Sequence, residues 1–386
     1  MKRKLWFLLL GCLLFTGAYA EGNGEHIQTI QEGVNSVLNG LDFSQTVDIA
    51  LNVPGWGEHE SVEQVVRRIA TGEVFSADDV LNMLTGSFAK ELQTLSKMML
   101  SIMLPVLLVS LLTHTLIPQY DSLLTVSKSV SSVLVLTPII VMTISELEHT
   151  KETIIAMTQR MERMLPMLLT LLTALGGSAS SAFLHPMVAA ASGSMVFLAR
   201  EVILRLVMCT CAVTTVNHLS DKAHLTRMVQ LLRGAVCWLL GISFTVFLGA
   251  MSLQGVTSAS IDGVAIRAAK YAVDNFVPVV GGMFSDTMDT LVGCTLIVKN
   301  ALGVATVIVL LSVLAAPLIR TLAAVFILRF SAALLEPIAD GDTICAIGDF
   351  ARTVILFFIT MLCVGTMYFL LIAQIMLVGN LTVLLR

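Results

Sequence analysis

The residues best suited to chemistry lie in one stretch, Asp274 to Asn300, which reads DNFVPVVGGMFSDTMDTLVGCTLIVKN. It contains three aspartates, a lysine and two asparagines, and it lies between long apolar runs. Asp286 and Asp289 have i,i+3 spacing, so a helix would place both carboxylates on one face, where they could bind a cation. Polar groups at membrane depth must be buried in protein or line a cavity. The stretch could therefore bind a cation, line a hydrophilic passage, or form a structural hairpin whose polar groups satisfy broken helix ends.

Local signals predict that this stretch is a re-entrant hairpin of two half-helices. The pattern over 260–277 predicts an amphipathic helix at the membrane interface, which Pro278 would end or kink. Gly281 and Gly282 permit a turn and close approach. Ser285 is typical of a helix cap, because acidic residues follow it in the first turn, where the helix dipole favours them.

The composition indicates a membrane protein around this hairpin. The chain has 386 residues, of which 56% are hydrophobic and 13% charged, with a mean hydropathy of +0.87. A soluble domain is about one quarter charged. We therefore expect an all-α fold, a polytopic helical membrane protein with about six to eight spans. The net charge of -4 does not indicate a nucleic-acid-binding surface.

The chain divides into three expected parts. Residues 1–20 read as a signal peptide, with a basic start, an apolar run and an Ala-Tyr-Ala site; an uncleaved anchor helix is the alternative. Residues 21–97 would then be an exported segment, with helical patterns around a turn at 52–57. Its modest apolar faces suggest docking onto partners or the membrane. Residues 98–386 form the polytopic membrane domain.

Hydropathy predicts how the membrane domain is divided. A charged amphipathic segment, 145–163, separates the early spans from 165–216, which could cross twice or fold back around Gly176–Gly177. Within that region Glu201 and Arg205 can pair on one helix face. The apolar segment 321–335 is short and contains Arg329. The clear spans are 98–117, 123–144, 234–254, 301–319 and 354–378.

Charge bias predicts the topology of the C-terminal half. Residues 217–233 are rich in Lys, Arg and His with a single acid, which places them in the cytoplasm. Residues 336–349 contain four acids and no base, so we expect them outside. Similar patterns before Pro166 and Pro278, each followed by a glycine pair, suggest an internal repeat of 123–233 and 234–378, a feature of transporters and channels.

Little in the sequence supports catalysis. His59-Glu60 lacks the second histidine of a zinc-protease motif, and no P-loop is present. Asp340-Gly-Asp342 resembles the motif of intramembrane aspartyl proteases only loosely, with no convincing partner aspartate. We expect no enzyme activity, no cofactor and no metal.

Two blocks resemble a known family. The run AVDNFVPVVGGMFSDTMDTLVGCTLIVKNALGV (272–304) and the block Glu336-Pro-Ile-Ala-Asp340 are similar to the stage III sporulation protein AE family of endospore-forming bacteria. The resemblance implies a multi-pass protein of the mother-cell membrane around the forespore, within a secretion-like complex. Its implied partners are ring-forming membrane proteins, a secretion-type ATPase and a forespore-side protein. The family has no established catalytic residues, so none are implied here.

Together these features predict a non-enzymatic subunit of a sporulation secretion or feeding channel that is needed for forespore development. The alternative is a standalone secondary transporter with its site in the 274–300 hairpin. The candidate channel or packing residues are Asp274, Asn275, Pro278, Gly281, Gly282, Ser285, Asp286, Asp289, Lys299, Asn300, Glu336, Pro337 and Asp340.

Overall fold

The fold was taken from a computed structural model. For 24–31, 50–53, 57–60, 121–132, 253–276 and 281–289 it describes only the backbone. The described residues are 24–41, 50–53, 57–71, 99–108, 121–219, 225–276, 281–339 and 341–384, with a few single positions between 43 and 96.

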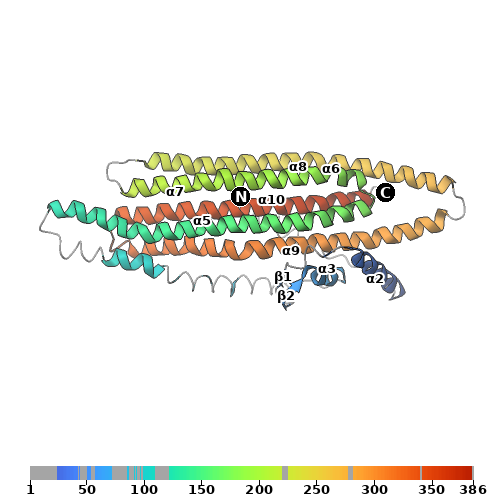
Figure 1. Cartoon of the computed structure of the whole chain (residues 1–386), viewed down its shortest axis with the longest axis horizontal. Coiled ribbons are helices and arrows are strands. Elements are labelled where there is room, and N and C mark those ends of the chain that lie inside the picture. The colour runs from blue at the N-terminus through green and yellow to red at the C-terminus, as the bar shows by residue number, and fades with distance from the viewer. Residues whose placement is uncertain are drawn as a thin grey trace.

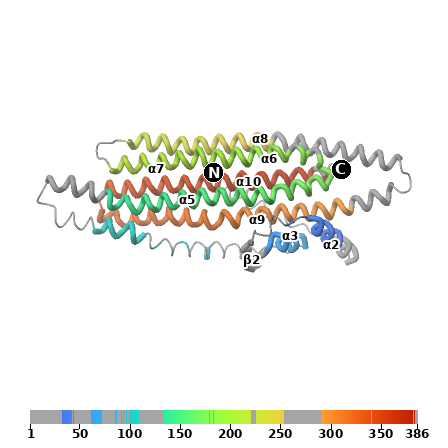
Figure 2. Tube along the Cα trace, viewed as in Figure 1, coloured from blue at the N-terminus to red at the C-terminus, as the bar shows by residue number. Residues whose placement is uncertain are grey.

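Five long helical rods lie side by side in an elongated bundle (Figure 1). The rods are α5 (Asp121–Ala174), the continuous run of α6 (Ser178–Phe197), η3 (Leu198–Ile203) and α7 (Leu204–Leu219), α8 (Thr226–Phe276), α9 (Gly281–Leu335) and α10 (Gly341–Leu384). The tube in Figure 2 shows that successive rods run in opposite directions. The α7–α8 and α9–α10 connections therefore lie at one end of the bundle, and the α5–α6 and α8–α9 connections at the other.

The helices are longer than the sequence predicts because several expected boundaries are absent. Helix α5 begins at Asp121, has 54 residues and runs through the charged segment 145–163. Helix α9 has 55 residues and joins the predicted spans 301–319 and 321–335 into one. Among the described residues, four helices are long and apolar enough to cross a membrane, together with the shorter apolar helix Met99–Leu108. The predicted class, an all-α helical membrane protein, is confirmed.

The predicted break at the first glycine pair is confirmed. Gly176 has a φ of 92°, a left-handed conformation that glycine adopts without steric cost. The amide of Gly177 donates to the carbonyl of Leu172 (3.1 Å) and that of Gly176 to Thr173 (3.0 Å). These two bonds form a Schellman motif, which ends α5 and turns the chain into α6.

Helix α10 is the central helix, since it contacts every other rod. Missing side chains allow it to approach α9 closely. A Cβ on Gly365 would lie 2.5 Å from Leu314 Cδ2, and a Cβ on Gly303 of α9 would lie 2.5 Å from Met376 Sδ. The two helices can interlock only because these positions are glycine.

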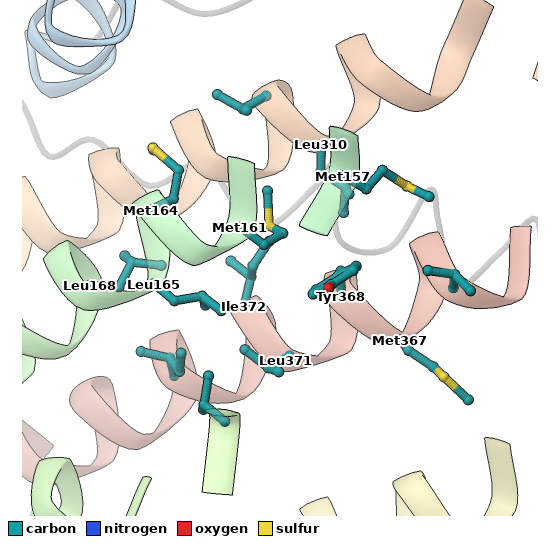
Figure 3. Packing of buried hydrophobic residues seen from close by; sticks show 14 of the residues in the cluster. Met157, Met161, Met164, Leu165, Leu168, Leu310, Met367, Tyr368, Leu371 and Ile372 are labelled. Carbon is teal, nitrogen blue, oxygen red and sulfur yellow. The ribbon is translucent and has the colours of Figure 1, made fainter. Parts of the chain in front are cut away.

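Two hydrophobic cores lie one after the other along the bundle. The smaller core lies at the end with the α7–α8 and α9–α10 connections; on α5 it ends at Met142 and on α9 it begins at Ala323. The larger core takes up the rest, from Ile154 onward on α5 and up to Leu314 on α9. Figure 3 shows its centre, where methionines and leucines of α5 pack against α10.

Between the two cores lies a layer of buried polar side chains, here called the polar layer. Its members are Thr143, Glu146 and Thr150 of α5 and Thr321 of α9, all less than 3% exposed, with the half-buried Arg320. Burying such groups is costly unless each is hydrogen-bonded. The polar layer therefore marks a boundary between two parts of the bundle.

The segment before the bundle is partly helical, as expected, and packs against α9. Helices α2 (Gly24–Asn39) and α3 (Val62–Ala70) confirm two predicted helical patterns. The strands β1 (Ala50–Val53) and β2 (Gly57–Ser61) form a small antiparallel pair that the helical prediction for this segment missed. Both helices contact α9, so the docking surface expected for partners is at least partly occupied within the chain (Figure 1).

Candidate functional site

Lys299 is the predicted site residue with the clearest structural role. Its side chain is completely buried between α9 and α10. The Nζ atom donates to the carbonyl oxygen of Met376 (2.8 Å) and to Oδ1 of Asn380 (3.0 Å). Gly379 leaves the space for the ammonium group, because any side chain there would collide with Nζ. Lys299 thus joins two helices through neutral oxygens. In the neighbouring residue Asn300, the buried Oδ1 atom has no hydrogen bond.

The predicted hairpin is the junction of two long helices. Helix α8 runs unbroken from Thr226 to Phe276, so the separate interface helix expected at 260–277 is instead its last part. Helix α9 begins at Gly281, so Ser285 lies inside the helix and does not cap its start. Pro278 and Asp340 both lie outside the described residues, Pro278 within 277–280 and Asp340 just before α10. Side chains of Asp274, Asn275, Asp286 and Asp289 are also outside them, so their roles stay predictions.

A second polar site joins α7, α8 and α10 around Asp349. Arg233 donates to Oδ1 of Asp349 (3.0 Å) and to its carbonyl oxygen (2.8 Å). His218 Nε2 lies 3.0 Å from Oδ2. Arg352, mostly exposed, approaches Oδ1 at 3.4 Å. The carboxylate, only 17% exposed, accepts bonds from two other helices and so fixes the relative positions of all three.

This contact corrects the predicted topology. His218 and Arg233 lie in the segment expected in the cytoplasm, and Asp349 ends the segment expected outside. Residues in direct contact cannot lie on opposite sides of a membrane. The prediction failed because the positive-inside rule counts Lys and Arg, and acidic residues carry little topological information. Glu336 and Pro337 are exposed in the α9–α10 connection.

A third polar site is the ion pair within the polar layer. Glu146, 1% exposed, accepts from Arg320 Nε (3.2 Å) and from Thr321 Oγ1 (2.9 Å). A groove of about 320 Å³ opens beside this pair, between α5 and α9, and Glu91, His149 and Glu152 also line it. Acids and bases meet in this groove, so it offers both signs of charge to a polar molecule.

The predicted pair of Glu201 and Arg205 is confirmed, and it lies on the exposed side of its rod. The backbone around it forms the π-helical turn η3. Such a turn inserts an extra residue into a helix and is frequent at functional sites. The rod continues through this turn into α7.

Sequence reasoning missed both ion-pair sites. Glu146 and Arg320 were read as boundaries of separate spans, and Asp349 as part of an outside loop. A signal was available, since an ionisable residue inside an apolar helix indicates a buried partner. The sequence alone could not supply the partner, which lies 174 residues away for Glu146.

The long apolar helices and their buried polar contacts define a helical membrane protein. A family model described as stage III sporulation protein AE matches residues 60–379, and the chain belongs to this family. It is 28% identical to the stage III sporulation protein AE of Bacillus subtilis (strain 168), with 100% of both chains covered. No solved structure matches the chain.

Proposed function

We propose that this protein is an integral membrane subunit of a sporulation-specific secretion or feeding channel that links mother cell and forespore. Its place would be the mother-cell membrane around the forespore, and forespore development would depend on it. The observation that carries the proposal is the family match over 60–379, which includes nearly the whole bundle. The proposed role is non-enzymatic.

The packing of the bundle supports a role as a rigid platform. Each of the three polar sites joins two or more helices, and α10 holds all the rods together. A transporter that alternates between two states needs a group of helices that can move against another. Here the same helix contacts every rod, which favours a fixed subunit over a standalone transporter.

The platform would work with partners. Ring-forming membrane proteins, a secretion-type ATPase and a forespore-side protein are the proposed neighbours, as the family resemblance implies. The junction of α8 and α9 would pack at, or line, the conducting centre. The exported segment, including α2 and α3, would contact partners in the space between the two membranes.

The test is affinity purification of the tagged protein from sporulating cells, followed by transport assays on the protein alone. We expect the ring-forming proteins to co-purify and the isolated protein to transport no solute. Solute transport by the isolated protein, lost in Asp286→Ala or Asp289→Ala, would overturn the proposal in favour of a transporter. Failure of all three partners to co-purify would also contradict it.

A further inference from the structure

The bundle is too long to lie within one bilayer. Helices α5, α8 and α9 have 54, 51 and 55 residues. At about 1.5 Å per residue, each is roughly 75 to 85 Å long, whereas the hydrocarbon core of a bilayer is about 30 Å thick. More than half of each helix must therefore lie outside the hydrocarbon. Which part is outside can be read from the exposed side chains.

Exposed apolar side chains mark the part that fits lipid. On α8 the described side chains of this kind include Met228, Leu231, Trp238, Ile242 and Val246. On α5 they end at Ile144, and on α9 they include Leu322, Phe326, Phe330 and Leu334. The sets on α5 and α9 surround the smaller core, whereas the set on α8 continues along the larger core, to which Val236 and Leu240 of α8 belong. The smaller core and the apolar surface around it are named the membrane end.

The surface changes character beyond the polar layer. On α5 the exposed side chains now include Glu148, Lys151, Glu152, Glu162 and Arg163. Charged groups that face hydrocarbon are costly, and they are rare on lipid-facing surfaces. Across the bundle, α6 exposes Ser178, His185 and Ser194. The half that holds the larger core, named the far half, thus exposes charged side chains on α5 and polar ones on α6, beside single exposed apolar side chains such as Phe197, Leu311 and Leu377.

Docking of the N-terminal helices points the same way. Helix α2 packs on α9 within the far half, where Gly33 lies against Cys294. It exposes Glu32, and its exposed Asn35 and Asn39 accept hydrogen bonds from Arg67 of α3. Lipid cannot cover α9 where this polar segment does.

We propose that only the membrane end lies in the bilayer, and that the far half, with α2 and α3 docked on it, projects from the non-cytoplasmic side. The connections α7–α8 and α9–α10 then lie in the cytoplasm, in keeping with the basic segment 217–233. The apolar surface extends farther along α8 than along α5, so the bundle is tilted in the bilayer, as membrane helices commonly are. This arrangement does not depend on the channel role.

Two exposed residues on opposite sides of the bundle, Ser194 of α6 and Glu162 of α5, lie at about the same distance along it from Asp349, so they allow a sharp test. Ser194 lies about 36 Å along its rod from His218, which contacts Asp349. The hydroxyl of Thr158 on α5 accepts from Tyr368 on α10, so these two residues lie at the same level of the bundle. Tyr368 lies 19 residues beyond Asp349, and Glu162 lies four residues beyond Thr158. At about 1.5 Å per residue, Glu162 is therefore about 34 Å along the bundle from Asp349. Both distances exceed the bilayer thickness. A projecting half exposes both residues, whereas a polar face within the membrane would expose only Glu162.

The experiment labels single cysteines in the full-length protein, produced in vegetative cells from a variant without its seven native cysteines. A membrane-impermeant maleimide reagent that shifts the protein on a gel is added to intact protoplasts. We expect a shift for Glu162→Cys and Ser194→Cys, and none for Val141→Cys or Ile242→Cys at the membrane end. Glu336→Cys in the α9–α10 connection should shift only after permeabilisation.

Three results would overturn the proposal. Labelling at Glu162→Cys with protection at Ser194→Cys would show a one-sided polar face inside the membrane. Protection at both would place the far half in lipid or in the cytoplasm. Labelling of Glu336→Cys in intact protoplasts would reverse the orientation. Should either variant fail to insert, Gln159→Cys and His185→Cys, also exposed, replace them on the same two sides.

Discussion

The membrane end and the far half are held together by different forces. At the membrane end, ion pairs centred on Asp349 and, at its border, Glu146 join helices with a small core between them. In the far half, a large core of methionine, leucine and valine does most of this work, and Lys299 binds only neutral oxygens. We attribute the difference between the two parts to their surroundings, lipid for the membrane end and water for the far half. Lipid provides no hydrophobic drive between helices, so polar contacts and close packing must hold them, whereas in water apolar burial dominates.

The largest expected loss comes from breaking the contact at the membrane end. Asp349→Ala removes the partner of Arg233 and His218, both largely buried, and should cost about 3 kcal/mol or more, because unpaired charges remain. Thermal unfolding in detergent measures it. The matched control is Arg352→Ala, which removes a 66% exposed partner of the same carboxylate and should cost less than about 1 kcal/mol. Equal losses would show that the buried pairs do not hold this end.

A similar but somewhat smaller effect is expected at the polar layer. Glu146→Ala should destabilise the protein by about 3 kcal/mol, because Arg320 and Thr321 lose their acceptor. The exposed neighbour Glu148 provides the control, and its replacement by alanine should change the unfolding temperature little. The comparison between the two regions would need revision if Glu146→Ala unfolded at the wild-type temperature.

Close packing in the larger core predicts a moderate effect. Gly365→Ala places a Cβ 2.5 Å from Leu314 and should cost about 1 to 3 kcal/mol through overpacking. Gly348→Ala, on the same helix, meets nothing within 4 Å and should be neutral or stabilise by up to about 1 kcal/mol through helix propensity. The unfolding temperature should therefore fall in Gly365→Ala and stay the same or rise in Gly348→Ala. An equal fall in both variants would argue against the α9–α10 contact.

The smallest and most local effect is expected where α2 docks. In Gly33→Leu the new side chain meets Cys294, because even a Cβ would lie 2.6 Å from its sulfur. Helix α2 should separate from α9 while the bundle stays folded. Limited proteolysis should then cleave the N-terminal segment faster, with no change for Glu32→Leu on the exposed face. Unchanged cleavage in Gly33→Leu would mean that this contact does not hold the segment.

Local sequence patterns predicted the local structure well. The apolar spacing in α2 and α3, the break at Gly176 and the pairing of Glu201 with Arg205 each depend on residues a few positions apart. The all-helical membrane class followed from composition alone. Lys299 was identified as a site residue because a lysine between apolar runs needs a partner.

Helix length and long-range contacts could not be read in the same way. A span of about 20 residues was assumed, so Ser145 and Arg320 were taken as boundaries, although neither breaks a helix. The partners of Lys299 and Arg233 lie 77 or more residues away along the chain, and a single sequence does not show which helices meet. The charge on Asp349 was taken as a sign that its segment lies outside the membrane, whereas the carboxylate binds Arg233 and His218 of neighbouring helices.

Electron microscopy of the full-length protein in lipid nanodiscs tests the central claim most directly. Our account predicts that the disc surrounds the smaller core and that helical density extends about 40 Å beyond one face, from the length of α5 after Glu148. The density for α2 and α3 should lie beside that projection, outside the disc. Density that protrudes equally from both faces, or a disc that surrounds the larger core, would contradict the account.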